Sequence, residues 1–367
     1  MQKKITYRIG DVSKIYSGGD RPEIYSDIQN SECPIPIYSN GLDNEGLYGY
    51  TNKSQIEGDC ITVAARGVNI GTVFYRPTPF LPIVRLLSVI PNRTLVNAKY
   101  LYYYFQIDTI IGTGSAQPQL TIPFFQKKKI LIHEDISYQQ KIASILSAYD
   151  KLIQNYKKQI EALQTTASEL YKEWFVRFRF PGWQNAKFEN GIPEGWKVEK
   201  LGTLANISTG KCNREDAEDD GIYPLFDRSQ EIKKSNEWIK DCEAIIVPGE
   251  GTSFIPRYYK GKFNLHQRCY CVEPKYPDFG KFLFYVLMLN RKYFISVATG
   301  ATVPSLRYNN FASMKFILPE ISLCNNFNKI ANDIFAKVDN LQQQITNLTQ
   351  QRDLLLPRLM SCKLEVK

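Results

Sequence analysis

Apolar residues recur every three or four positions through residues 142–174. They alternate by four and three without a break: Ile142, Leu146, Tyr149, Ile153, Tyr156, Ile160, Leu163, Ala167, Leu170 and Trp174. This spacing keeps an apolar seam on one face of an α-helix, where a second helix can cover it. The pattern therefore predicts a long helix that packs along its length against a partner helix.

The same spacing returns near the end of the chain, with one interruption at Arg352. Its positions are Phe327, Ala331, Ile334, Val338, Leu341, Ile345, Leu348, Arg352, Leu355 and Leu359. Pro319 lies before this predicted helix and Pro357 falls in its final turn. Such stripes can also be helix faces that are buried on their own globule. Two matched stripes of this length instead favour a coiled coil between the two helices.

The remainder of the chain consists of shorter apolar segments. Several are rich in β-branched or aromatic residues, are bounded by Gly, Pro or Asp, and predict strands: residues 61–65, 71–75, 244–247 and 268–272. Two others predict helices, at residues 99–107 and 281–289. The mixture is typical of α+β globules with many short strands and irregular loops.

These segments occur in two copies, in the same order. Residues 9–18 match 201–210 with both glycines in register, 61–63 match 245–247, 99–103 match 281–285, and 113–120 match 299–306. The separation drifts between roughly 182 and 192 residues, as expected where loops differ in length between two diverged copies of one fold. The chain is therefore predicted to contain an internal duplication.

The predicted fold class is α+β, with two pseudo-twofold-related globular domains joined by two long helices that form an antiparallel coiled coil. Antiparallel packing lets each helix follow its own globule and still contact the other helix. A helix over residues 142–174 would be roughly 50 Å long, about 15 base pairs of duplex. The expected boundaries are a first globular domain at 1–138, its helix at 139–178, a linker and second globular domain at 179–322, and the second helix at 323–367.

The net charge permits a polyanionic partner, although moderate basicity alone is weak evidence for one. The chain has 46 Lys and Arg against 37 Asp and Glu, a net charge of +9, which suits double-stranded DNA. Basic and amide side chains beside the matched turns at Gly67 and Gly251 are the candidate DNA contacts, although an ordinary solvated side chain is an equal alternative for each. The candidates are Lys53, Arg66, Asn69 and Arg76 in the first copy, and Arg214, Arg228, Lys233, Lys234, Arg257 and Lys260 in the second.

A catalytic or metal site is not expected. Only His133 and His266 are present, so a catalytic triad or a histidine-rich metal site has almost no histidine to use. Asp227, Glu231 and Lys233 have a nuclease-like spacing, but a solvated turn is the preferred interpretation. The eight cysteines include no Cys-x-x-Cys pair and are expected to be reduced thiols in a cytoplasmic protein. No signal peptide or membrane-spanning run is expected.

Several segments resemble the conserved regions of specificity subunits of type I restriction-modification systems. Residues 150–163, with Trp174-Phe175 and 179–182, resemble the central conserved region, and residues 195–198 resemble the start of the second copy. Residues 345–361 resemble the distal conserved region. One departure is Cys362, where the family usually has glycine, and this change is expected to alter the final turn.

The resemblance implies a non-catalytic scaffold with two target recognition domains, each reading one half of a bipartite site on double-stranded DNA. It also implies two methyltransferase subunits as partners, joined by restriction subunits in the complete nuclease. S-adenosylmethionine, ATP and magnesium would then be held by those partners, and no cofactor by this chain. The alternatives are a tandem protein-interaction adaptor without DNA binding and an enzyme of an unfamiliar type.

Overall fold

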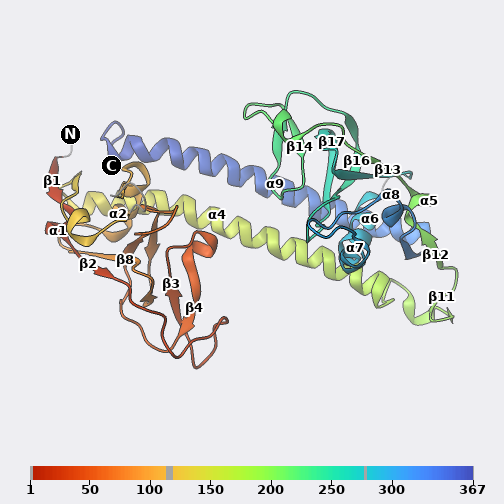
Figure 1. The fold of residues 1–367 in the computed structure, drawn as a ribbon, viewed down its shortest axis with the longest axis horizontal. Helices are drawn as coiled ribbons and strands as arrows, with labels where there is room; N and C mark the ends of the chain where they lie inside the picture. Colours follow the sequence, from red (N-terminus) through yellow and green to blue (C-terminus); the bar gives the residue numbers. More distant parts are fainter. Residues whose placement is uncertain (1–2, 113–118, 277–278, 367) are drawn as a thin grey trace. The chain divides into compact units, whose positions relative to one another are not determined.

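The structure is a computed structural model that describes residues 3–112, 119–276 and 279–366. It divides into two compact units (Figure 1). Unit 1 comprises Met1–Tyr156 with Gln344–Lys367, and unit 2 comprises Lys157–Gln343. Each unit therefore contains one globular lobe and one part of each long helix. Most of the matched segment that begins at Thr113 lies outside the described residues.

Both predicted long helices are present. Helix α4 spans Ile136–Tyr171 and helix α9 spans Ile321–Met360, which are 36 and 40 residues. At about 1.5 Å per residue they are roughly 54 and 60 Å long. In unit 1 the beginning of α4 packs beside the end of α9, and in unit 2 the end of α4 packs beside the beginning of α9. The antiparallel pairing predicted from the sequence is therefore confirmed within each unit.

The N-terminal lobe contains three sheets, helix α2 (Ala98–Ile107) and short helical turns. The strand order is β1 (Lys4–Arg8) with β9 (Lys129–His133); β2 (Ser13–Ser17), β8 (Leu87–Pro91), β5 (Cys60–Val63) and β6 (Val73–Arg76); and β4 (Leu47–Thr51), β3 (Ile35–Tyr38) and β7 (Leu81–Pro82). The turns are α1 (Ile9–Val12), η1 (Asp43–Gly46) and α3 (Ile122–Phe125). Helix α2 packs on β5 and β6 and confirms the helix predicted at residues 99–107.

The C-terminal lobe has a six-stranded sheet covered by helix α6 (Gly280–Leu289), which confirms the helix predicted at residues 281–289. The sheet order is β13 (Ala205–Thr209), β18 (Cys269–Pro274), β16 (Lys240–Pro248), β17 (Arg257–Leu265), β14 (Tyr223–Phe226) and β15 (Lys233–Ser235). A separate pair joins β12 (Lys197–Lys200) to β19 (Lys315–Leu318). The other elements are η3 (Trp183–Asn185), β10 (Phe188–Glu189), β11 (Ile192–Pro193), α5 (Leu201–Leu204), η4 (Arg214–Asp216), α7 (Arg291–Val297) and α8 (Tyr308–Ala312).

The two lobes share one strand plan, as the internal repeat predicts. The order β2, β8, β5, β6 in the N-terminal lobe corresponds to β13, β18, β16, β17 in the C-terminal lobe. The parallel pair of β3 and β7 corresponds to that of β14 and the end of β17. One difference is that the continuous strand β17 takes the place of both β6 and β7.

The repeated glycines at positions 18 and 210 have a common steric cause. A Cβ atom on Gly18 would lie 2.7 Å from the backbone nitrogen of Ile83, and one on Gly210 would lie 1.7 Å from the carbonyl oxygen of Leu265. In each lobe the first strand of the larger sheet therefore passes too close to another backbone for any side chain.

The predicted seam residues lie on buried or half-buried faces of both helices. In unit 1, Ile142 and Leu146 share a core with Leu356 and Leu359. Other seam positions that are buried or half-buried are Tyr149, Ile153, Tyr156, Ile160, Leu163, Leu170, Ile334, Val338, Leu341, Ile345, Leu348 and Leu355.

The interruption of the second stripe at Arg352 is a polar contact between the helices. The Arg352 guanidinium lies 2.7 Å from the Asp150 carboxylate of α4, within unit 1. The Tyr103 hydroxyl donates a hydrogen bond to the same carboxylate. An unpaired charge at this partly buried position would be unfavourable, and this pairing offsets that cost.

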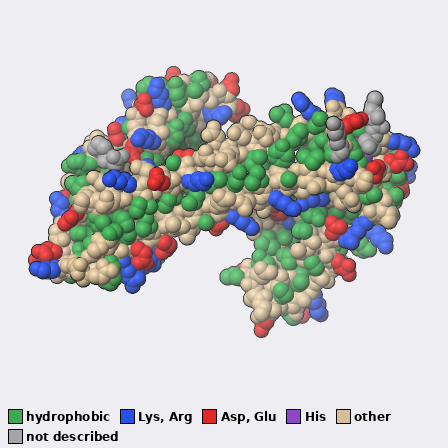
Figure 2. Space-filling view, turned by 180° about the vertical axis from the view of Figure 1, so that it is seen from behind, with side chains coloured by type: hydrophobic (Ala, Val, Ile, Leu, Met, Phe, Trp, Pro, Cys, Tyr) green, Lys and Arg blue, Asp and Glu red, His purple; other side chains and the backbone are tan. Residues whose placement is uncertain are grey.

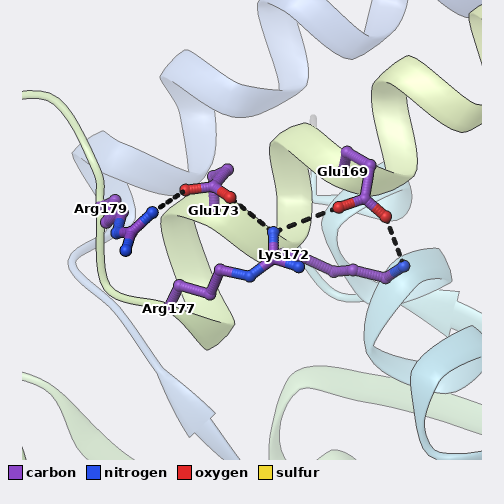
Figure 3. A network of polar contacts seen from close by, with 5 residues as sticks. All are labelled: Glu169, Lys172, Glu173, Arg177 and Arg179. Carbon is purple, nitrogen blue, oxygen red and sulfur yellow. Dashed lines mark hydrogen bonds and ion pairs between the residues drawn. The ribbon is translucent and has the colours of Figure 1, made fainter.

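Helix α4 ends in a π-helical turn, Lys172–Val176. Trp174 and Phe175 are both buried there, against Phe327 of α9. On the outer side, Glu169 accepts hydrogen bonds from Lys172 and Arg177, as Figure 3 shows. Glu173 contacts Arg177 and Arg179 at the exit of the helix. The end of α4 is thus held by aromatic packing on one side and by ion pairs on the other.

Candidate nucleic-acid interface

Among the DNA-contact candidates, Arg76 points into its lobe. Its side chain is 2% exposed, its Nε donates to the Thr62 hydroxyl at 3.0 Å, and its guanidinium lies 3.6 Å from the centre of the Tyr38 ring. Burial lowers the pKa of the guanidinium. The guanidinium also donates to the side chain and the carbonyl of the exposed Glu45. In this structure Arg76 therefore stabilises the N-terminal lobe, because its side chain is buried and bound to residues of that lobe.

Arg257 has a comparable position in the C-terminal lobe. Its guanidinium lies 5.0 Å from the centre of the Phe226 ring. It donates to the carbonyl oxygens of Asp227 and Ser229 at 2.6 and 2.8 Å, and burial lowers its pKa. Arg257 thus holds the loop after β14 from the inner side.

Lys233 and Asp227 belong to the same loop support. The Lys233 ammonium lies 3.1 Å from the buried Asp227 carboxylate, which also accepts hydrogen bonds from the backbone and hydroxyl of Ser229. Burial by itself would raise the pKa of Asp227, but these bonds outweigh burial and lower it. The solvated turn expected at Asp227, Glu231 and Lys233 is therefore wrong at Asp227, because this carboxylate is an internal anchor.

The other candidates are distributed over several elements. Lys53, Lys234 and Lys260 are exposed, and Arg66 is partly exposed. The Asn69 amide donates to the Asn40 carbonyl at 3.2 Å, and Arg214 begins the turn η4. On the face drawn in Figure 2, basic and acidic side chains are interspersed.

The loops of the C-terminal lobe do form one polar hollow of about 270 Å³. Its lining includes Arg228, Glu250 and His266. The Glu250 carboxylate contacts two guanidinium groups, Arg228 at 2.7 Å and Arg268 at 3.3 Å. The His266 ring accepts a hydrogen bond from the Arg268 backbone N–H at 2.9 Å, and its pKa is lowered by burial and by the nearby Arg228. A neutral imidazole beside two fixed arginines suits an anionic or base-edge ligand.

Sequence reasoning identified Arg228 in this hollow but missed Glu250, and it also missed Arg268, which contacts Glu250. Across the described ranges, no group of three or more His, Cys, Asp or Glu side chains is placed to hold a metal ion. In the same part of the chain, no helix has the length and apolar character needed to cross a membrane. The charged side chains at this hollow are those of Arg228, Asp227 and Glu250.

A family model for the type I restriction modification DNA specificity domain matches residues 1–165 and 193–354. The chain belongs to this family. The two matched segments cover the two lobes and most of both long helices, so the resemblance noted in the conserved helical segments is confirmed. The role of a specificity subunit is supported and that of a protein-interaction adaptor is not.

Relatives agree with this assignment. The MjaIX specificity subunit of Methanocaldococcus jannaschii is 27% identical over 346 residues, which cover 81% of this chain and 76% of that protein. The EcoDI specificity subunit of Escherichia coli is 31% identical over 159 residues, 43% of this chain and 35% of that protein. The crystal structure of a type I S subunit from M. genitalium matches with a TM-score of 0.69 at 17% identity and covers 98% of this chain and 96% of that chain. This last likeness concerns the fold.

Proposed function

We propose that this chain is the DNA-reading scaffold of a type I restriction-modification complex and carries no catalytic step itself. Each lobe binds one half of a bipartite site on double-stranded DNA. The observation that carries the proposal is the duplicated strand plan, found in a chain that belongs to a family of DNA specificity domains. Two related but different lobes suit two half-sites of different sequence.

The long helices have two roles in this proposal. Helix α4 continues without a break from unit 1 into unit 2, so it is suited to fixing the spacing of the two half-sites. The polar faces away from the seam are available to dock two methyltransferase subunits. Restriction subunits would join the same complex.

Catalysis is assigned to the partners. Adenine methylation requires S-adenosylmethionine and a base rotated out of the duplex, and the methyltransferase subunits would supply the pocket. ATP and magnesium would serve the restriction subunits. Expected partners are therefore DNA, methyltransferase subunits and restriction subunits, and no cofactor is assigned to this chain.

Lengthening both helices tests the spacing role. One heptad inserted into α4 and one into the antiparallel partner segment of α9 preserves the apolar seam and adds about 10 Å to each helix. We expect the spacer between the half-sites to grow by about three base pairs, with both half-sites unchanged. The measurement is sequencing of methylated sites in cells that express the variant with its methyltransferase.

A heptad inserted into α4 alone is the control, because it displaces one seam against the other and should abolish methylation. Gel shifts of the native complex with a bipartite duplex and with its separate halves test DNA reading directly. An unchanged spacer in the doubly lengthened variant contradicts the proposal that the helices fix the spacing of the half-sites. Equal binding to all duplexes contradicts the proposal that the lobes read the DNA sequence.

A further inference from the structure

Each lobe carries an exposed arginine at the same register position after the strand that pairs in parallel with β3 or β14. After β7, the Ile83 N–H donates to the carbonyl of the last residue of β3 at 2.9 Å, and Arg85 follows two residues later. After β17, the His266 N–H donates to the carbonyl of the last residue of β14 at 3.0 Å, and Arg268 follows two residues later. Arg85 is exposed and the Arg268 side chain is 53% exposed. The two arginines therefore occupy equivalent register positions, although Val84 and Arg85 have positive φ values of 53° and 59° and Gln267 and Arg268 do not.

A second loop carries opposite charges at equivalent places. Arg66 follows β5 and forms an isolated antiparallel bridge with Gln119. Glu250 follows β16 and forms the same kind of bridge with Ser305. In both lobes the next residue is a glycine with positive φ. The backbone is thus the same at these two positions while the charge is reversed.

A third loop connects the first two in the N-terminal lobe. The Asn40 side chain accepts a hydrogen bond from the Ala65 N–H at 2.8 Å and donates to the Val84 carbonyl at 2.7 Å. It therefore joins the loop that carries Arg66 to the turn that carries Arg85. Asn40 is the second residue after β3.

In the C-terminal lobe, Arg228 is the second residue after β14, at the position of Asn40. There side chains also join the same three loops, because Glu250 contacts both Arg228 and Arg268. The Glu250 side chain is 15% exposed, whereas those of Arg228 and Arg268 are 46% and 53% exposed. The carboxylate therefore lies at the base and the two guanidinium groups face outward.

We propose that these three loops form the base-reading corner of each lobe, in which Arg85 and Arg268 make the shared DNA contact and positions 66 and 250 make the two half-sites different. This inference rests on the proposed function and adds the residues that carry it out. The chemical class of ligand is the major-groove edge of duplex DNA.

The chemistry predicts what the C-terminal corner reads. A guanidinium held by a carboxylate on one side keeps free N–H donors on the other, in a fork that fits O6 and N7 of guanine. Arg228 and Arg268 are fixed in this way by Glu250, so the second half-site is expected to contain G·C pairs at the positions that they face. In the N-terminal corner, Arg66 has no such carboxylate partner among the described residues, and its contacts with DNA are expected to be less restricted by the protein.

The test uses the full chain in complex with its methyltransferase. Methylated sites are first identified by sequencing, and binding is then measured on duplexes with each base pair of the site substituted in turn. We expect Arg85→Ala and Arg268→Ala each to lower affinity roughly 5-fold to 100-fold, each through a different half-site. Glu250→Gln should weaken the discrimination at G·C positions of the second half-site while non-specific binding stays within about threefold.

Lys127→Ala and Lys292→Ala are the matched controls, since both remove an exposed positive charge outside the corners. Thermal melting of each variant shows whether it folds. Unchanged half-site preference in folded corner variants overturns the inference, as does an equal loss on all duplexes, which indicates phosphate contact only. If the native complex itself shows no bipartite preference, the proposed function fails as well, so the two failures are distinguishable.

Discussion

The two lobes share main-chain hydrogen bonds and bridges at their loops but carry different side-chain chemistry there. At the second residue after the equivalent strands β3 and β14, one lobe has Asn40 and the other Arg228. At the equivalent bridges, one has Arg66 and the other Glu250. The comparison shows that hydrogen bonds of the main chain define the scaffold, while side chains at a few positions are free to differ. A protein that reads two different half-sites needs this separation.

The helix pairs of the two units also differ. Unit 1 places a polar group in the seam, where Arg352 pairs with Asp150. Unit 2 instead packs Phe327 of α9 among Tyr171, Trp174 and Phe175 at the end of α4. The stability of unit 2 therefore depends more on aromatic burial.

The largest expected effect comes from breaking the aromatic contact. Phe327 is completely buried, so Phe327→Ala should lower the free energy of unfolding by about 3–5 kcal/mol. Hydrogen exchange should localise the loss to unit 2 and leave the strands of the N-terminal lobe protected. Ile330→Ala is the matched control, because Ile330 is 41% exposed on the same helix. Equal losses from both changes would contradict a specific aromatic core.

Acid should destabilise unit 1 through His133. This residue is completely buried at the end of β9, and burial, with a smaller effect of the Lys4 ammonium, lowers its pKa to about 4. Counted from the first residues of the equivalent strands β9 and β19, the position of His133 corresponds to Pro319 in the C-terminal lobe. Proline has no side chain that titrates. The unfolded chain takes up a proton near pH 6.5, which the folded chain resists until about pH 4. Stability is therefore full above pH 6.5 and falls by about 3 kcal/mol between pH 6.5 and 4.

Urea unfolding at several pH values measures this change. A His133→Gln variant should have lower stability at pH 7 but a flatter dependence between pH 6.5 and 4. A slope as steep as that of the native chain would assign the acid sensitivity to other groups, such as His266.

The smallest expected effect concerns how the long helices end. Two residues beyond α9, Cys362 has a φ of 61°, and two residues beyond the π-helical turn of α4, Phe178 has a φ of 57°. Glycine adopts this left-handed conformation without steric cost. Cys362→Gly should therefore be more stable than Cys362→Ala by about 1 kcal/mol in thermal melting. Both variants lose the thiol that lies 3.1 Å from the His133 ring, so their difference reports the backbone alone.

Much of the fold could be predicted from periodicity. The four-three spacing located α4 and α9, and the repeat located equivalent strands, because apolar and glycine positions are fixed by packing. The expected change at Cys362 corresponds to the left-handed position itself, where the family's usual glycine would be unstrained. These signals are local in the sequence and have direct steric causes.

The DNA-contact residues were less predictable because charge does not say which way a side chain points. Arg76 and Arg257 both lie inside, since a guanidinium can satisfy several buried carbonyl or hydroxyl groups at once. Arg268 and Glu250 were missed because the repeat was aligned on apolar residues and glycines. Arg85 and Arg268 stand at the same distance along the chain from matched residues of the two lobes, and this spacing was the available signal. Recognising it requires the strand register to be known.

The split of one long strand into two has a consequence for how each lobe tolerates change. In the C-terminal lobe, β17 runs unbroken from its antiparallel to its parallel partner, so an added residue anywhere along it would shift the register of a sheet. In the N-terminal lobe, residues 77–79 lie between β6 and the buried Phe80, which forms an isolated bridge with Ile56. Extra length can enter at 77–79 without shifting the register of β6 or β7, so the first lobe tolerates there a change that the second does not.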